Sequence, residues 1–248
     1  MSKEKTEMTA GSKAMAKEET VLRFDIHQRI QHGLMASSFI LLVLTGWPLS
    51  THGIGASHSL VALFGGHDGC AWMHRFAAVI LIISSVYHVL YLMTLFFRGK
   101  LRPNMVPGPK DAKHAVQNLL FFVGLRKERP NFPRFTYFEK FDYWAVFWGV
   151  LIMVGSGFVR WFPDLTVKYF PSWTYEIAHF AHADEAILAG LAIFVWHFYN
   201  VHLRPGIFPM SKVFLTGRLT MSELKHEHPA EYAEVMEKRA ADGKQDKS

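Results

Sequence analysis

Several of the fourteen histidines in this 248-residue chain lie in long apolar stretches, where an ionisable side chain is costly and therefore marks a functional site. His74 and His88 are 14 residues apart in one such stretch, and His182 and His197 are 15 residues apart in another. At 1.5 Å per helical residue, these intervals correspond to about 21 and 22 Å. Imidazole coordinates metal ions and transfers protons. The spacing therefore indicates chemistry at two depths.

The elements that carry these histidines are apolar segments long enough to cross a bilayer as helices, which takes about 20 residues. Four segments qualify, at about 30–49, 74–97, 142–162 and 178–201. A soluble domain of this size would not cover so much apolar surface, so we expect an all-α integral membrane four-helix bundle. We expect the bundle domain to cover 23–212, between a polar cytoplasmic tail, 1–22, that is disordered or bound to a partner and lacks a cleavable signal, and a C-terminal helix and tail, 213–248.

The distribution of Lys and Arg predicts the orientation of the spans. The 50–73 loop has neither residue and the 163–177 loop has only Lys168. The 98–142 loop has ten: Arg98, Lys100, Arg102, Lys110, Lys113, Arg126, Lys127, Arg129, Arg134 and Lys140. We therefore expect both termini and the 98–142 loop on the cytoplasmic side of the membrane. Four tryptophans lie at the outward ends, as an aromatic belt does: Trp47, Trp72, Trp161 and Trp173.

With this orientation, the histidines fall on two levels. His74 and His182 share an outer level, His88 and His197 share an inner level, and His32 at the start of the first span is also on the inner side. Haem iron takes axial imidazole ligands, and helix bundles build such sites from facing helices. Two levels of histidines about 20 Å apart match two b haems stacked across the bundle.

Other chemistries fit the residues less well. The single cysteine, Cys70, excludes an intramolecular disulfide, and the sequence around it lacks the CxxCH pattern of covalent haem attachment. There is no tight cluster of thiolate and imidazole ligands for zinc. The outward loops contain no nucleophile–base pair, phosphate-binding loop or set of iron–sulfur cysteines, and nothing indicates nucleic-acid binding. Any substrate site of an enzyme complex should therefore lie on another subunit.

The stretch QHGLMASSFILLVLTG resembles the first span of the cytochrome b subunits of respiratory oxidoreductases, such as formate dehydrogenase gamma, nickel–iron hydrogenase cytochrome b and thiosulfate reductase cytochrome b. In that motif a histidine lies 14 residues before a glycine, here His32 and Gly46. HRFAAVILIISSVYH, FEKFDYWAVFWG, HADEAILA, HFYNVHLRPGIFPM and FLTGRLTMSELKHEHPAEY are similar to a branch found beside multihaem cytochromes in anaerobic bacteria. The resemblance covers about residues 23–235.

This resemblance implies a di-haem cytochrome b that transfers electrons between the quinone pool, menaquinone or ubiquinone, and a partner subunit of an anaerobic respiratory complex. The partner would carry haem c, iron–sulfur or molybdenum centres. The resemblance also implies an outer haem on His74 and His182 and an inner haem on His32 and His197. The alternative function is a haem-binding membrane anchor or sensor without quinone turnover, and a third is a haem-free proton or metal transporter.

His88 departs from the family pattern, because it lies at the right depth to compete with His32 for the haem of His197. Three readings remain open. In the first, His32 is the ligand and His88 lines a quinone or proton site. In the second, His88 is the ligand and His32 serves the quinone. In the third, a further haem uses His32 or His27 together with His202.

Polar residues that could exchange protons with a quinone gather at the predicted inner ends of the spans. They are Asp25, His27, Gln28, Arg29, Gln31, Glu139, Lys140, Asp142, Asn200 and His202. Candidate partners of haem propionates are Arg75, Arg160, Arg29, Arg98 and Arg204. His179 is a candidate partner of a propionate or of a ligand. Asp184 and Glu185 would lead protons outward, touch a partner or charge the first turn of a helix.

Overall fold

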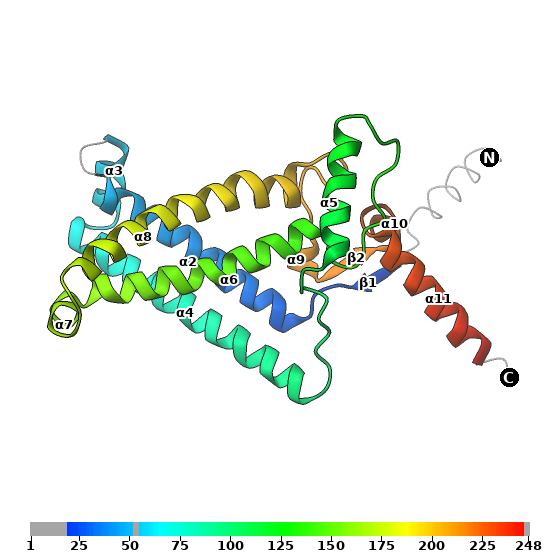
Figure 1. Cartoon of the computed structure of the whole chain (residues 1–248), viewed down its shortest axis with the longest axis horizontal. Coiled ribbons are helices and arrows are strands. Elements are labelled where there is room, and N and C mark those ends of the chain that lie inside the picture. The colour runs from blue at the N-terminus through cyan, green and yellow to red at the C-terminus, as the bar shows by residue number, and fades with distance from the viewer. Residues whose placement is uncertain (1–18, 52–54, 246–248) are drawn as a thin grey trace, which may run out of the picture. The chain divides into compact units, whose positions relative to one another are not determined.

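The computed structural model describes residues 19–51 and 55–245 (Figure 1), so the predictions for 1–18, 52–54 and 246–248 lie outside the described residues. The chain forms two compact units. The bundle unit consists of residues 26–106 and 138–214. The small unit combines the N-terminal segment up to Asp25 with 107–137 and the chain from Leu215 onward. The units therefore interleave along the chain, whereas the sequence predicted consecutive divisions.

The bundle unit is built on four long helices. These are α2 (Ile26–Ser50), α4 (His67–Phe97), α6 (Tyr137–Trp161) and α8 (Trp173–Leu191), which continues through two π-helical segments, Ala192–His197 and Tyr199–Leu203. Each is long and apolar enough to cross a membrane, as predicted. Each begins several residues before its predicted start, because hydropathy marks only the part of a helix that matches the hydrocarbon core.

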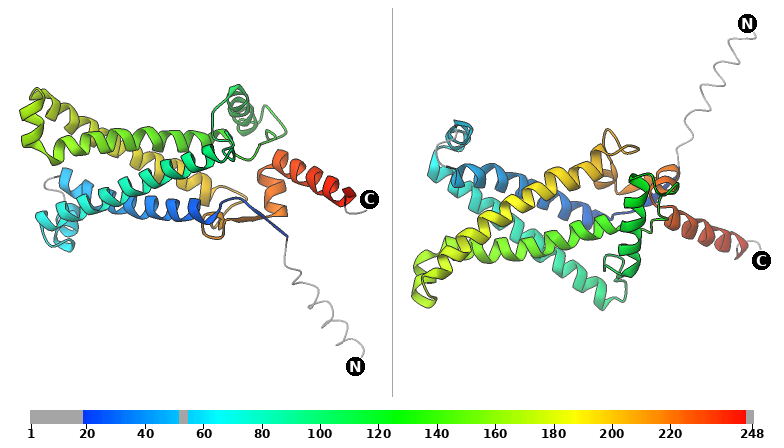
Figure 2. Two further views of the ribbon diagram at one scale, coloured as in Figure 1. Left: turned by 90° about the horizontal axis from the view of Figure 1, so that it is seen from below. Right: turned by 45° about the horizontal axis from the view of Figure 1, so that its top comes forward.

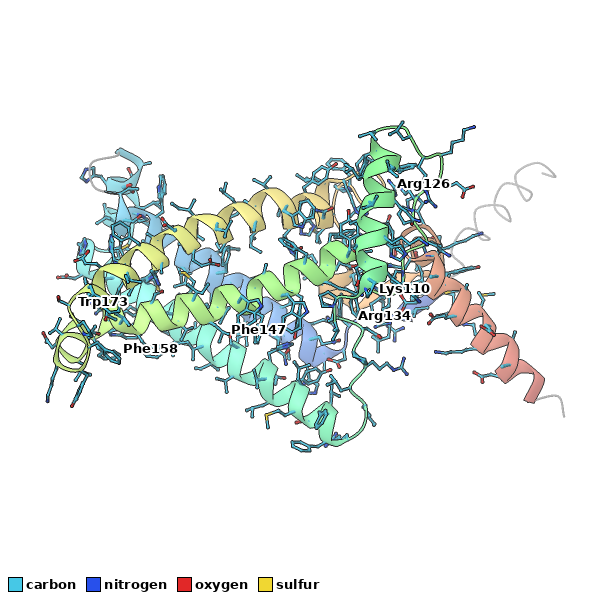
Figure 3. All side chains as sticks on the ribbon, viewed as in Figure 1. Lys110, Arg126, Arg134, Phe147, Phe158 and Trp173 are labelled. Atoms are coloured by element: carbon cyan, nitrogen blue, oxygen red, sulfur yellow. The ribbon has the colours of Figure 1, made fainter. Side chains whose placement is uncertain are left out.

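Two short helices lie in the turns that the sequence predicts to face outward. They are α3 (Gly55–Leu63), between α2 and α4, and α7 (Pro163–Tyr169), between α6 and α8. Both lie at the same end of the unit in the views of Figures 1 and 2. Phe158 and Trp173 also lie near α7 (Figure 3). The position of these aromatic side chains at the end of the spans is typical of a membrane interface.

The interior of the bundle unit holds small and polar side chains, whereas large apolar side chains such as Ile40, Ile83 and Leu151 are exposed. This is the reverse of a soluble protein and is expected where lipid surrounds the helices. Six of the eight buried residues of α2 and α4 recur every seventh position: Gln31, Ser38 and Thr45 in α2, and Cys70, Ala77 and Ser84 in α4.

Contacts between these two rows fix the antiparallel register of α2 and α4. The Ser84 hydroxyl donates to the carbonyl of Gln31 (3.3 Å), and the Cys70 thiol donates to the carbonyl of Thr45 (3.5 Å). A seven-residue repeat of small residues lets two helix backbones approach closely along a seam. Cys70 therefore serves as a packing residue.

The small unit contains a two-stranded antiparallel sheet and mostly short helices. The strands are β1 (Thr20–Leu22) and β2 (Arg218–Thr220), and Val21 pairs with Leu219. The helices are α5 (Pro109–Phe122), α10 (Met221–Glu227) and α11 (Pro229–Gln245), and α9 (Val213–Thr216) joins the two units. β1 lies within the segment 1–22 that was predicted as a tail, and its backbone pairs with β2 of the same chain.

Glu231 of α11 joins the three chain segments of the small unit. Its carboxylate is buried and forms ion pairs with Arg23 and with Arg134, the latter at 2.6 Å. The two arginines also exchange hydrogen bonds, because each guanidinium donates to the backbone carbonyl of the other, at 2.5 and 2.6 Å. Nε2 of His228 accepts from the Arg23 guanidinium (3.3 Å), and Nδ1 of His228 donates to the Pro133 carbonyl (2.9 Å). The 98–142 loop is thus partly an ordered structural element.

Candidate functional site

Contacts of the histidines within the four long helices fall mainly at two levels, which we name outer and inner after the orientation predicted from the sequence. At the outer level, Thr45 of α2 contacts His74 of α4, and Ser156 of α6 contacts His182 of α8. At the inner level, the contacting residues are Gln31, His32, His88, Asp142, Tyr143 and His197. The interval between the two levels is 13 to 15 residues in every helix, which corresponds to about 20 Å.

The outer level brings His74 and His182 together. Their ring centroids are 6.3 Å apart and the rings are inclined by 67°. An imidazole nitrogen lies about 2 Å from a coordinated metal, so two imidazoles on opposite sides of one metal have ring centres about 6 Å apart. Ordinary aromatic pairs also occur at such distances, so the distance alone does not distinguish them from a metal site. A metal site also requires that each ring has an unprotonated nitrogen available for the metal.

Two hydroxyl groups determine the protonation of these rings. Nδ1 of His74 lies 2.9 Å from Oγ1 of Thr45, and Thr45 donates its own proton to the Leu41 carbonyl (2.7 Å). The hydroxyl oxygen therefore accepts from Nδ1–H of His74. Ser156 repeats the arrangement, because it donates to the carbonyl four residues earlier (2.7 Å) and lies 2.9 Å from Nδ1 of His182. In both rings Nε2 is left unprotonated, which is the form that binds a metal.

Two glycines lie against the outer rings, and the one at position 46 is in the closer contact. A Cβ at Gly46 of α2 would lie 3.0 Å from Cε1 of His74, which is closer than a side chain tolerates without movement. A Cβ at Gly157 of α6 would lie 3.4 Å from Cε1 of His182. Each histidine ring therefore contacts two consecutive residues of a neighbouring helix, a hydroxyl residue and then a glycine: Thr45 and Gly46 for His74, and Ser156 and Gly157 for His182. The outer residues fit the bis-histidine haem site predicted from the sequence.

The inner level brings His32 beside His197. Their ring centroids are 6.5 Å apart, and the rings are inclined by 34°. Oδ2 of Asp142 lies 3.1 Å from Nδ1 of His197. An ionised carboxylate only accepts hydrogen bonds, so it holds the proton on Nδ1 and leaves Nε2 free, in the manner of carboxylate–histidine–metal triads. The ring of Phe214 lies 5.7 Å from that of His32 and 5.7 Å from that of His202.

His88 occupies a different position from the one that competition with His32 would require. Its Nδ1 lies 2.9 Å from Oε1 of Gln31, and its Nε2 lies 3.0 Å from the hydroxyl of Tyr143. Both ring nitrogens are therefore engaged in hydrogen bonds with α2 and α6. This geometry favours the reading in which His32 pairs with His197 and His88 belongs to a polar chain beside them.

The π-helical end of the fourth span changes the direction of its side chains. The Phe198 amide donates to the Ile193 carbonyl, and the Arg204 amide donates to the Tyr199 carbonyl (3.0 Å), both across five residues. A π-helical turn contains an additional residue, so the α-helical period no longer predicts which face His197 and His202 occupy. Such segments occur frequently at functional sites.

Buried arginine nitrogens provide a second test of the haem prediction. Nε of Arg29 and Nε of Arg160 are buried and have no hydrogen-bond partner among the described residues. A buried N–H of a cation requires an acceptor, and an anionic group such as a propionate would supply one. Two other predicted propionate partners lie over aromatic rings, Arg75 over Trp161 (5.7 Å) and Arg204 over Phe138 (5.4 Å).

Other candidates for the haem surroundings are more exposed. Arg98 follows the end of α4 and is exposed. His179 is also exposed, and its ring contacts that of Phe180 at 5.7 Å. Their proposed roles beside a haem stay predictions.

The quinone candidates have varied surroundings. Nδ1 of His27 lies 2.7 Å from the Tyr87 hydroxyl, and its ring lies 5.7 Å from that of Tyr91. The amide nitrogen of Asn200 donates to a carbonyl of its own helix (2.8 Å), which leaves its oxygen as an acceptor. Gln28, Glu139 and Lys140 each have interactions of their own. Asp25 belongs to the small unit, so its place beside the others stays a prediction.

Asp184 and Glu185 do not lie in the first turn of a helix, which corrects one of their three interpretations. The helix begins at Trp173, and its first-turn acid is Glu176. Glu185 lies against α6, because a Cβ at Gly149 would come within 2.7 Å of its Oε1. A carboxylate at this position in a span is a functional candidate rather than a helix cap.

The histidine pattern alone did not reveal Thr45, Ser156, Tyr143 or the glycine at position 157 as parts of the site. A signal for some of them exists in the sequence. Asp142, Gly149 and Ser156 recur every seventh residue of α6, as the small and polar residues of α2 and α4 do. Such a repeat within an apolar segment marks the face that turns toward the other helices.

Comparison with known proteins identifies the family of the chain. The family model for the prokaryotic cytochrome b561 matches residues 23–207. The chain is 24% identical over 225 residues to the cytochrome b556(fdo) subunit of formate dehydrogenase from Escherichia coli K12, an alignment that covers 89% of this chain and 96% of that protein. The same subunit from E. coli O6:H1 and from O157:H7 matches equally. The chain belongs to the prokaryotic cytochrome b561 family, and it is therefore a membrane-spanning, haem b-binding cytochrome of electron transport.

Proposed function

We propose that this cytochrome holds two b haems, one between His74 and His182 and one between His32 and His197, and transfers electrons between a quinone and a partner subunit. The observation that carries the proposal is the repetition of one arrangement at two levels. At each level, two histidines from different helices face each other at 6.3 or 6.5 Å. Two such sites at opposite ends of a bundle support electron transfer across the bilayer.

A bound haem supplies reversible one-electron exchange at its iron. The residues of the chain orient the ligands for it. Thr45, Ser156 and Asp142 hold protons on the Nδ1 atoms of His74, His182 and His197, so that each Nε2 keeps its lone pair. The buried Nε atoms of Arg160 and Arg29 are suited to propionates at the outer and inner levels, respectively.

The quinone site in this proposal lies beside the inner pair. A quinone that is reduced takes up protons as well as electrons, so its site needs groups that exchange them. Gln31, His88 and Tyr143 form a hydrogen-bonded chain across α2, α4 and α6. His27 and Tyr87 form a second pair, at 2.7 Å. Either the Gln31–His88–Tyr143 chain or the His27–Tyr87 pair can donate a hydrogen bond to a quinone oxygen and exchange a proton with it.

The substrate reaction belongs to another subunit in this proposal. The relatives named above are subunits of formate dehydrogenase, which supports assembly of this chain with a redox partner carrying haem c, iron–sulfur or molybdenum centres. We place both termini and the inner histidine level on the cytoplasmic side of the bacterial inner membrane, because the basic 98–142 segment lies at that end.

Spectroscopy of membranes that contain the full-length chain tests the proposal. A reduced-minus-oxidised spectrum should show the α band of haem b. A menaquinol or ubiquinol analogue should then reduce the haem, and an inhibitor that competes with quinone should prevent that reduction. Haem that dithionite reduces but neither quinol reduces would contradict quinone exchange and favour the alternative of a haem-binding anchor or sensor.

A further inference from the structure

Helix α5 of the small unit turns a polar side inward. Asp111 and Asn118 are 9% and 7% exposed. The Asn118 amide donates to the Tyr137 hydroxyl (3.1 Å), and the His114 ring packs against that of Phe132 at 5.8 Å. A helix at the surface of a soluble domain usually buries its apolar side instead. The inward side of α5 is therefore its polar side, and it contacts the rest of the small unit.

The outward side of α5 is apolar. Four residues form a strip within an arc of about 100°, at 100° per residue: Val116, Leu119, Leu120 and Val123. Leu119 is 61% exposed and Val123 is 59% exposed. Leu125, just beyond the helix, continues the strip and is 77% exposed. No described residue covers this strip, which requires an apolar environment outside the chain.

Basic side chains flank the apolar strip. Lys110 and Lys113 are exposed at the start of α5, and Arg126, Lys127 and Arg129 follow its end. Figure 3 labels Lys110 and Arg126 near the two ends of the helix. The only acid within α5 is Asp111, which faces inward and accepts from the backbone amide of Gly108 (2.7 Å). The outward side is therefore apolar at its centre and cationic at its ends.

The covalent chain keeps α5 close to the membrane surface. The carbonyl of Met105 accepts a hydrogen bond from the indole of Trp144 in α6 (2.9 Å). Pro109, the first residue of α5, is four residues later, which an extended chain spans in about 14 Å. At its other end, α5 is joined through residues 123–136 to α6, which is long and apolar enough to cross the membrane.

We propose that the apolar strip of α5 inserts into the surface of the bilayer at the side where α4 ends and α6 begins, among anionic phospholipids. Val116, Leu119 and Val123 would reach the acyl boundary, and the flanking lysines would meet lipid phosphates, as in other amphipathic interfacial helices. Phospholipid fits better than a protein partner because α5 begins four residues after Met105, which is bound to a membrane span, and because cationic side chains flank its apolar strip. The proposal rests on the four spans and not on quinone exchange.

Depth-dependent quenching tests this insertion on the full-length, haem-loaded chain. Cys70→Ser supplies the background, since serine preserves the donation to the Thr45 carbonyl and the native thiol is buried. A polarity-sensitive fluorophore is attached at Leu119→Cys on the strip or, as the matched control, at Gln117→Cys on the polar flank of the same helix. Each protein is reconstituted in vesicles of phosphatidylcholine with phosphatidylglycerol, and the haem spectrum verifies the fold.

We expect brominated phospholipid to quench the label at 119 several-fold more than the label at 117, and aqueous iodide to show the opposite order. The difference should shrink in vesicles of phosphatidylcholine alone. Equal quenching at both positions would overturn insertion, and an undiminished difference in phosphatidylcholine alone would overturn the role of anionic lipid. The same label can also be measured in native membranes, where the chain is assembled with its partner subunits. If iodide reaches the label at 119 in vesicles but not in native membranes, a protein partner covers the strip, and the proposal is overturned.

Discussion

His74 and His182 face each other from α4 and α8 with ring centroids 6.3 Å apart, and each donates its Nδ1 proton to a hydroxyl on an adjacent helix. The hydroxyls belong to Thr45 and Ser156, whose own protons go to carbonyls of their helices. This relationship explains how two neutral imidazoles can be held with both Nε2 atoms ready for a metal. It also identifies residues whose loss should weaken haem binding without removing a ligand.

Removal of these hydroxyls should weaken the outer haem. We expect Thr45→Val and Ser156→Ala each to lower its affinity by about 10- to 100-fold, the usual effect of deleting a partner of a metal-bound histidine. Haem titration of the apoprotein measures the affinity. Ser85→Ala is the control, because Ser85 donates only to the Leu81 carbonyl of its own helix. Unchanged affinity in both variants would show that the hydroxyls do not orient the ligands.

A methyl group at Gly46 should disturb the same haem by contact. In Gly46→Ala the new Cβ would lie 3.0 Å from Cε1 of His74, so the ring must shift. We expect a weaker or spectrally altered outer haem, while the inner haem keeps its spectrum. Gly155→Ala serves as the control, because a Cβ there meets nothing within 4 Å. Low-temperature absorption spectra that are identical in both variants and the native protein would contradict this account of Gly46.

Loss of the Asp142 carboxylate should raise the reduction potential of the inner haem. The ferric state carries one more positive charge than the ferrous state, so a nearby carboxylate stabilises the ferric state. Asp142→Asn removes that charge from Nδ1 of His197. We expect a redox titration to show an upward shift for one haem only. Asp164→Asn, in the exposed part of α7, should move neither potential. A downward shift, or equal shifts of both haems, would contradict the assignment of Asp142.

The spans and the two levels of histidines were predictable because both depend on helix rise and apolar length. His74, His182, His32 and His197 lie where their depths placed them. The choice between His32 and His88 was not predictable from depth, because both residues lie at the inner level. It depends on side-chain direction, and the π-helical turns before His197 alter the α-helical period on which that direction is calculated.

The small unit shows a different limit of sequence reasoning. Its core joins Arg23, Arg134 and Glu231, which are separated by 97 or more residues. No periodicity links such positions, and charged residues are ordinarily assigned to the solvent surface. The basic residues of the 98–142 segment were therefore used only to predict the orientation of the spans, although one of them, Arg134, forms an ion pair with Glu231 of the same chain.

Removal of the Glu231 charge should destabilise the small unit. Glu231→Gln leaves Arg23 and Arg134 without their common counter-ion, and loss of one partner of a buried ion pair typically costs about 3–5 kcal/mol. We expect faster amide exchange across β1, β2 and α11 in the detergent-solubilised full-length chain. Glu234→Gln, at an exposed position of the same helix, should leave exchange rates unchanged. Equal exchange in the two variants would contradict a structural role for this ion-pair cluster.

The most direct test of the two-haem arrangement is the haem-to-protein ratio, measured by pyridine haemochrome assay in the native protein and in His32→Ala and His88→Ala. We predict two haems in the native protein, one in His32→Ala and two in His88→Ala, because His32 faces His197 while both nitrogens of His88 are hydrogen-bonded elsewhere. Loss of a haem in His88→Ala with both haems retained in His32→Ala would contradict the assignment of the inner site.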